Sequence, residues 1–319
     1  MATSPVRIAP MSRRELLALA AGGLAAYASP RAAGAQAKSL KLGNVPVVNF
    51  ASIYRLRTIS KQFGFQVEFV NFPSGTERLN ALAAGYIDGA PTGVTQPILL
   101  RSKGVPIKIV ADTSRKGKGI MAGKAITSFK DLRGKDIGSV PGSGPDIFLR
   151  QKLIDEGLNP GQDVNLVNVD WLQMPAAVLA GRVAAASGNE PYIADFVLKG
   201  GRVLSFLNDT KLGDIDGVMN FPDSFIKKDR ELAKAVVAAM AKATQEVRDP
   251  NVVVETMADA VKVDKAVILK SLENMTFSVK PDGKALANLA EAMKSMGLIA
   301  RVPAVDEYLD MSLVNEVAG

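Results

Sequence analysis

The chain has 319 residues, of which 47% are hydrophobic and 22% charged, with 39 Lys and Arg against 32 Asp and Glu. This length allows two domains with ordinary cores. The sequence contains no His and no Cys, which excludes imidazole and thiol catalysis, thiolate metal sites and disulfides. Basic and acidic residues are interspersed, so we do not expect nucleic-acid binding. We expect neither a metal nor a cofactor.

Residues 1–37 have the organisation of an export signal. Arg13 and Arg14 precede a modest apolar stretch from Leu16 to Tyr27, and the segment ends in the A-x-A pattern of residues 35–37. The paired arginines resemble a twin-arginine signal, with a general secretory signal as the alternative. Cleavage near Ala37 would place the mature protein in the periplasm. No later apolar run is long enough to cross a membrane.

The rest of the chain alternates short apolar strands with helices. We expect strands at 40–48, 66–72, 87–90, 105–111, 136–140, 164–169, 183–186, 203–206 and 214–220. We expect helices at 52–64, 77–84, 95–103, from the 141–146 loop through 156, and at 192–199. From Asp223 the pattern is helical almost to the end. This order predicts an α/β protein with a helical C-terminal part.

Two segments, residues 67–93 and residues 164–191, are interpreted as copies of one unit. Each has an apolar strand, an Ala/Leu-rich helix that stops at Gly85 or Gly181, and a second strand of small residues. Strand, helix, strand is a βαβ unit with a parallel crossover. The repeat predicts two lobes of similar design, with one larger α/β domain as the alternative.

The predicted lobes divide at the 116–119 segment, Lys-Gly-Lys-Gly. Residues 38–117 with 219–319 would form the first lobe, on which the helical tail packs, and residues 118–218 the second. Ligands of open α/β sheets bind beyond the carboxyl ends of the strands. Two facing lobes would therefore place these ends on opposite walls of one cleft.

Loops at the predicted strand ends are rich in glycine and small polar residues, whose backbone N–H groups can reach a ligand. Two of the loops precede helices, and a helix N-terminus offers unpaired N–H donors and partial positive charge. Simple helix capping is the alternative role for their hydroxyls. The candidate ligand-binding residues in these two loops are Ser74, Gly75, Thr76, Gly142, Ser143 and Gly144.

Further candidates follow other strands. Thr92 and Gly93 end one second strand, and Asn189 and Glu190 end its counterpart. Glu190 would either accept a hydrogen bond from a ligand or cap the helix that follows it.

The first strand is followed by Asn49 and Phe50, which would form a wall or lid of the cleft. Trp171, the only tryptophan, would either cover an apolar part of a ligand or pack in the core or hinge. The Met residues of the tail are interpreted as core filler.

Two stretches now indicate a family: SFKDLRGKDIGSVPGSGPDIFLRQKLIDEGLNP (128–160) and VNVDWLQMPAAVLAGRVAAASGNEP (167–191). They resemble the periplasmic solute-binding proteins of ABC importers, in the nitrate/sulfonate/taurine-binding class, which includes pyrimidine-precursor binders. The resemblance implies a two-lobe, type II-like periplasmic-binding-protein fold whose hinge has two crossover strands. It implies ligand contacts at Ser74-Gly75, Thr92-Gly93, Ser143-Gly144 and Glu190-Pro191.

The function implied by this resemblance is capture of a small anion, a sulfonate, a carboxylate or a nitrate-like ion, by a monomer that delivers it to an ABC permease with its ATPase. Two features depart from the class, the basic 52–57 segment and Ala185 in place of an acidic residue. Related enzymes need a histidine or a cysteine that this chain lacks. A periplasmic enzyme using Asp146 and Glu190, and a sensor subunit for a membrane receptor, are the alternatives.

Overall fold

The computed structural model describes residues 38–318 apart from residues 73, 74, 209, 259 and 262. The predicted export signal therefore lies outside the described residues. The chain from Lys38 onward forms one compact unit. None of the helices described in it is both long enough and apolar enough to span a bilayer.

The described chain alternates strands and helices, and most of the predicted elements are confirmed to within a few residues. The strands are β1 (Lys38–Gly43), β2 (Phe65–Val70), β3 (Ala90–Gly93), β4 (Ile107–Lys116), β5 (Lys118–Ala122), β6 (Asp136–Ser139), β7 (Asn165–Asn168), β8 (Ala185–Asn189), β9 (Arg202–Phe206), β10 (Ile215–Pro222) and β11 (Met275–Phe277). The α-helices are α2 (Ala51–Ile59), α3 (Gly75–Ala83), α4 (Thr95–Ser102), α5 (Gly144–Asp155), α6 (Met174–Leu179), α7 (Tyr192–Leu198), α8 (Asp223–Lys228), α9 (Arg230–Glu246), α10 (Pro250–Met257), α11 (Lys265–Leu272), α12 (Gly283–Ser295), α13 (Val305–Tyr308) and α14 (Ser312–Ala318). Short 3-10 helices are η1 (Val48–Phe50), η2 (Ser60–Phe63), η3 (Phe129–Leu132) and η4 (Trp171–Gln173).

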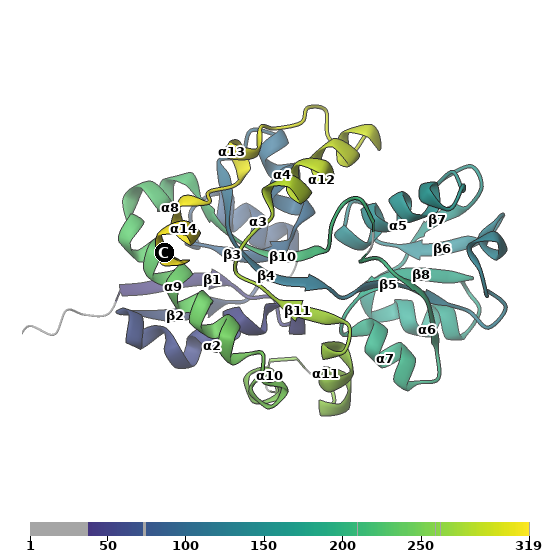
Figure 1. Cartoon of the computed structure of the whole chain (residues 1–319), viewed down its shortest axis with the longest axis horizontal. Helices are drawn as coiled ribbons and strands as arrows, with labels where there is room; N and C mark the ends of the chain where they lie inside the picture. The colour runs from purple at the N-terminus through teal and green to yellow at the C-terminus, as the bar shows by residue number, and fades with distance from the viewer. Residues whose placement is uncertain (1–37, 73–74, 209, 259, 262, 319) are drawn as a thin grey trace, which may run out of the picture. The chain divides into compact units, whose positions relative to one another are not determined.

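The strands form three sheets with the orders β1-β2, β11-β4-β10-β3 and β7-β6-β8-β5-β9. The chain changes sheet between β4 and β5, where Lys116 and Gly117 both have positive φ. It returns between β9 and β10, and Lys116 N donates to Asp214 O across the two crossing segments (2.6 Å). Figure 1 shows the five-stranded sheet with α5, α6 and α7 on the right, joined to the rest through β4 and β10. The change of sheet falls at the predicted 116–119 break.

The two copies of the repeat share one arrangement. In the second copy, β7 and β8 lie on either side of β6 and pair with it in parallel. In the first copy, β2 pairs in parallel with β1, whose other side makes a single parallel bridge from Leu42 to Gly89. Both crossovers are therefore parallel, as the repeat predicts.

The first copy differs in its second strand, for which the predicted range 87–90 was wrong. The strand is β3, which begins at Ala90 and pairs antiparallel with β10. Residue 89 is a glycine held close to β10, since a Cβ there would lie 2.6 Å from the Phe221 ring. After its one bridge to Leu42, the chain therefore turns into the neighbouring sheet.

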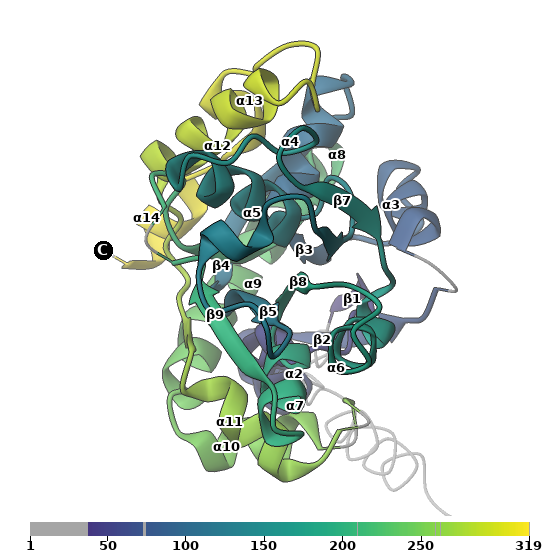
Figure 2. The ribbon, with the colours of Figure 1, turned by 90° about the vertical axis from the view of Figure 1, so that its right-hand side faces the viewer.

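The C-terminal part is helical as expected except at β11, which was not predicted and which joins the four-stranded sheet beside β4. The amphipathic pattern of α9 buries Leu232, Val236, Met240 and Ala243 at helical spacing. Helices α9 and α10 pack on α2. The C-terminal part also contacts the helices beside the five-stranded sheet, because α11 packs on α7 and α12 packs on α5. Figure 2 shows both pairs of helices.

Candidate functional site

A cavity of about 370 Å³ lies between elements attached to different sheets. Segments η1, α3, β3 and α4 contribute one wall, and α5, η4, β8 and α7 contribute the other. Its described lining residues are Val45, Val47, Asn49, Phe50, Gly75, Arg78, Thr92, Gly93, Thr95, Gln96, Ser143, Gly144, Pro145, Trp171, Asn189, Tyr192 and Asp216. The predicted arrangement, with strand ends and helix starts facing one another, is present at this cavity.

Most of the predicted site residues line this cavity. They are Asn49, Phe50, Gly75, Thr92, Gly93, Ser143, Gly144, Trp171 and Asn189. Ser74 lies outside the described residues. The structure does not place Thr76, Gly142 or Glu190 in the lining.

Each of these three residues is used elsewhere. Thr76 is exposed on the first turn of α3. The backbone N–H of Gly142 donates to Asp146 Oδ2 (3.0 Å). Glu190 is fully buried, and its carboxylate accepts from Ala194 N (2.9 Å) in α7, which is the capping role. Burial raises the pKa of Glu190 to about 7.

Three helices begin at the cavity. Gly75, Thr95 and Gly144 are the first residues of α3, α4 and α5, and all three line it. Ser143 is the N-cap of α5, where its Oγ accepts from Asp146 N (3.3 Å). Ser143 therefore both caps a helix and faces the cavity. The N-terminal ends of these helices bring partial positive charge to the same space.

Arg78 also lines the cavity, although it was not among the residues predicted from the sequence. It lies one turn into α3, it is partly buried, and burial lowers its pKa. Its Nε is buried with no hydrogen-bond partner, and none of the ion pairs found in the described chain includes it. Its position in the sequence, one helical turn after the predicted Ser74-Gly75-Thr76 loop, could have indicated this role, because side chains three or four residues apart share a helix face.

One wall of the cavity is aromatic. Trp171 and Tyr192 stack with an angle of 11° between their rings and 6.5 Å between ring centroids. Phe50 and Val47 belong to the opposite wall. Trp171 is thus a cavity residue, whereas Tyr192, which directly follows Glu190-Pro191, was missed.

A buried charge pair lies beside the cavity, and one of its members, Asp216, belongs to the lining. Asp216 is 7% exposed and Lys118 is fully buried, with 3.3 Å between Lys118 Nζ and Asp216 Oδ1. Lys118 Nζ also donates to Ile215 O (3.0 Å). Asn49 Nδ2 donates to the other carboxylate oxygen of Asp216. Burial lowers the pKa of Lys118, and Asp216 opposes this effect.

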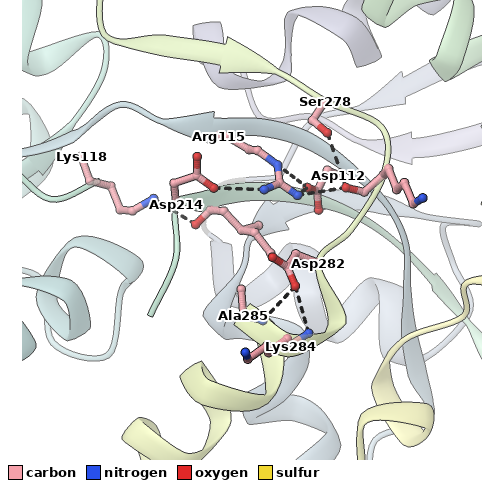
Figure 3. Close-up of polar contacts among 10 residues, drawn as sticks. Asp112, Arg115, Lys118, Asp214, Ser278, Asp282, Lys284 and Ala285 are labelled. Atoms are coloured by element: carbon pink, nitrogen blue, oxygen red, sulfur yellow. Dashed lines mark hydrogen bonds and ion pairs between the residues drawn. The ribbon is translucent and has the colours of Figure 1, made fainter. Parts of the chain in front are cut away.

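A second charge cluster lies nearby on β4, outside the cavity lining (Figure 3). Arg115 lies between two carboxylates, with Nη2 2.9 Å from Asp112 Oδ2 and Nη1 3.1 Å from Asp214 Oδ1. Arg115 Nη2 also donates to Lys280 O (3.0 Å). Burial raises the pKa of Asp112 to about 7, and Arg115 opposes this rise. The cluster ties β4 to the segments before β10 and α12.

The carboxylates considered for catalysis are not at the cavity. Asp146 is fully buried and accepts from Ser139 Oγ (2.9 Å), Gly142 N (3.0 Å) and Arg150 Nε (3.0 Å). Glu190 caps α7. Within the described residues, no group of three Asp or Glu side chains could hold a metal ion. The cavity thus combines three helix N-termini, the Arg78 guanidinium and aromatic side chains in one space.

Residues 33–262 match the NMT1-like family. The chain belongs to this family. It is 26% identical over 240 residues to the nitrate import ATP-binding protein of Synechococcus elongatus, covering 68% of this chain and 36% of that protein. It is also 32% identical over 125 residues to the taurine-binding periplasmic protein of Escherichia coli, covering 39% of this chain and 38% of that protein. The chain thus spans well under half the length of either relative in these matches.

The fold is that of the periplasmic binding proteins. The alkanesulfonate-binding protein of Xanthomonas axonopodis, solved bound to MOPS, superimposes with a TM-score of 0.73 at 22% sequence identity. The match covers 86% of this chain and 98% of that one. This member of the NMT1-like family therefore has the fold that its sequence resemblance implied.

Proposed function

We propose that this protein is the extracytoplasmic binding component of an ABC importer, and that it binds a small organic anion in the cavity. One observation carries the proposal: three helix N-termini meet at one cavity with the Arg78 guanidinium, which has no ion pair among the described residues. Backbone N–H groups at helix N-termini and a guanidinium, in a cavity that is partly shielded from solvent, favour binding of a carboxylate or sulfonate group. The apolar surfaces of Phe50, Trp171 and Tyr192 would contact the organic part.

The proposed mechanism is hinge closure. Residues 38–117 with 219–319 would form one lobe and residues 118–218 the other, with the hinge at the β4–β5 and β9–β10 crossings. A ligand that contacts both walls binds the closed form better, and it shifts the population by that difference in affinity. The residues we assign to ligand contact are the nine predicted residues in the lining, together with Arg78 and Tyr192.

The relatives support the proposed location and partner. One of them is named as a periplasmic taurine-binding protein and another as a component of nitrate import. We place this chain in the periplasm as a monomer, after cleavage of the export signal near Ala37, and we assign an ABC permease as the membrane partner. The ligand would leave unchanged, since no carboxylate proposed for catalysis faces the cavity.

A thermal-shift panel tests this function. The purified exported protein, unfolded and refolded to remove carried ligand, would be heated with nitrate, sulfate, bicarbonate, sulfonates, carboxylates and pyrimidines. A ligand at a hundred times its Kd stabilises by about 2.7 kcal/mol, a shift of about 5–10 °C at this size. We expect a shift from one class of organic anion, and its recovery intact by mass spectrometry. Conversion of the ligand to a product would contradict the proposal.

A further inference from the structure

The cavity contains buried acceptors for which the described residues supply no donor. Asn49 is 1% exposed, and its Oδ1 has no hydrogen-bond partner. Gln96 Oε1 is likewise buried and unpaired. Both residues line the cavity. Buried polar atoms in folded proteins are nearly always paired, so we expect an occupant of the cavity to supply donors to these two atoms.

The orientation of the Asn49 amide is fixed by its neighbour. Asp216 Oδ2 is a carboxylate oxygen and accepts hydrogen bonds, while the other oxygen of the same carboxylate, Oδ1, lies 3.3 Å from Lys118 Nζ. The amide nitrogen of Asn49 must therefore face Asp216, to which it donates. The amide oxygen is the atom left over. Exchanging its two ends would put two acceptors together.

The charges around the cavity restrict the donor further. Arg78 and Asp216 are the charged residues among the described lining residues. Asp216 is compensated by buried Lys118, and Arg78 has no ion pair among those found. The cavity thus has about one uncompensated positive charge, which suits a ligand of net charge −1. An ammonium group on the ligand would cancel that charge.

We infer that the ligand is a monoanion that also carries an uncharged O–H or N–H donor, with the acid group at Arg78 and the donor at Asn49 Oδ1. This inference rests on the proposed binding function and narrows its ligand class. Nitrate, sulfate and unsubstituted alkyl sulfonates lack the donor. A site built to pair a ligand donor discriminates against analogues without it, because its own acceptor is then left unpaired.

Matched ligand pairs test the inference by isothermal titration of the refolded protein. One pair is 2-hydroxyethanesulfonate and propane-1-sulfonate, and another is 4-hydroxybenzoate and 4-methylbenzoate. In each pair a hydroxyl replaces a methyl group of similar size. We expect the hydroxyl member of the preferred acid class to bind at least about tenfold more tightly. 2-Aminoethanesulfonate should bind more weakly than 2-hydroxyethanesulfonate.

The variant Asn49→Leu should reduce the hydroxyl preference to about twofold or less, and Gln96→Met tests the second acceptor if the first variant fails to fold. Equal affinity within both pairs would overturn the inference and leave anion binding standing. Tighter binding of 2-aminoethanesulfonate than of 2-hydroxyethanesulfonate would contradict the inference that the ligand's donor is uncharged. A preference that survives both substitutions would overturn the assignment to these two acceptors. Failure of every anion to bind would contradict both the proposed anion-binding function and this inference.

Discussion

At the scale of single residues, Arg78 decides the electrostatics of the cavity. Its guanidinium lines the cavity from α3 without an ion pair among those found in the described chain. The other charged lining residue, Asp216, is compensated by Lys118. An anion bound at this site, as we propose, would exchange its water for the guanidinium and the nearby helix N-termini.

Replacing Arg78 with Gln should weaken anion binding by about 10- to 100-fold, since hydrogen bonds to charged groups contribute about 1.5–3 kcal/mol. Titration calorimetry measures the change. Arg133→Gln is the matched control, because it removes the same charge from a side chain that is 60% exposed and outside the cavity. Similar losses in the two variants would show that only overall charge matters.

Burial of Asp112 predicts a pH dependence of stability. Its pKa is raised from 3.8 to about 7, so the folded state keeps a proton that the unfolded state has lost. The corresponding stability is fully present below about pH 4 and is lost as the pH rises through 7. The slope is at most about 1.4 kcal/mol per pH unit for one group.

Urea unfolding between pH 5 and pH 8 tests this expectation. The free energy of unfolding of Asp112→Asn should fall less steeply with pH than that of the parent protein. Asp264→Asn, at an exposed position, is the control and should keep the parent slope. An unchanged slope in Asp112→Asn would place the titrating group elsewhere, with Glu190 the next candidate because its pKa is also raised to about 7.

At the scale of elements, the strand pair β3–β10 holds the cavity wall in place. Gly93 and Gly217 are partners in this pair, and their surroundings differ. A Cβ on Gly217 would lie 2.7 Å from Phe50 Cε1 and 2.9 Å from Ser114 Oγ, whereas a Cβ on Gly93 would meet nothing within 4 Å. Phe50 lines the cavity, so crowding at Gly217 reaches the site.

Gly217→Ala should therefore destabilise the protein by about 1–3 kcal/mol through overpacking. It should also weaken ligand binding through displacement of Phe50. Gly93→Ala, the partner substitution, should change the free energy of unfolding by less than about 0.5 kcal/mol. Denaturant unfolding compares the two, and an equal cost at both positions would refute the packing argument.

Much of the element pattern could be predicted from the sequence, because apolar periodicity reports which faces are buried. The parallel repeat, α9 and the sheet change near Gly117 follow from local signals. The second strand of the first copy and β11 could not be predicted. Their pairing depends on β10 and β4, which are distant in sequence, and β11 is only three residues long.

The candidate site was predictable where loops carry glycine and small polar residues before helices. Arg78 and Tyr192 were missed because their roles depend on where a helix face points after folding. Glu190 was a candidate on the basis of its chemistry, yet Ala194 N and Asn274 already occupy its carboxylate. Asp216 was not predicted because it lies within the largely apolar strand β10, and its ion pair with Lys118 forms only in the folded chain.

At the scale of the whole molecule, the two crossings between sheets are the hinge that we propose, and the cavity lies between elements attached to the different sheets. One direct contact already links the walls, since Thr95 Oγ1 donates to Gly142 O (3.3 Å). Ligand binding to both walls should favour the closed population. Small-angle X-ray scattering should therefore give a smaller radius of gyration with ligand at about ten times the parent Kd, and a smaller change for Arg78→Gln at the same concentration. Identical radii with and without ligand in the parent protein would contradict hinge closure.

The most direct test of anion binding uses Trp171, the single tryptophan of the chain, which lines the cavity. Intrinsic fluorescence of the refolded protein would be recorded while organic anions are added. We expect a saturable change for one class of organic anion, with its midpoint shifted to about 10- to 100-fold higher concentration in Arg78→Gln. An unchanged fluorescence signal with every anion, or the same midpoint in Arg78→Gln, would contradict the assignment of this cavity as the anion-binding site.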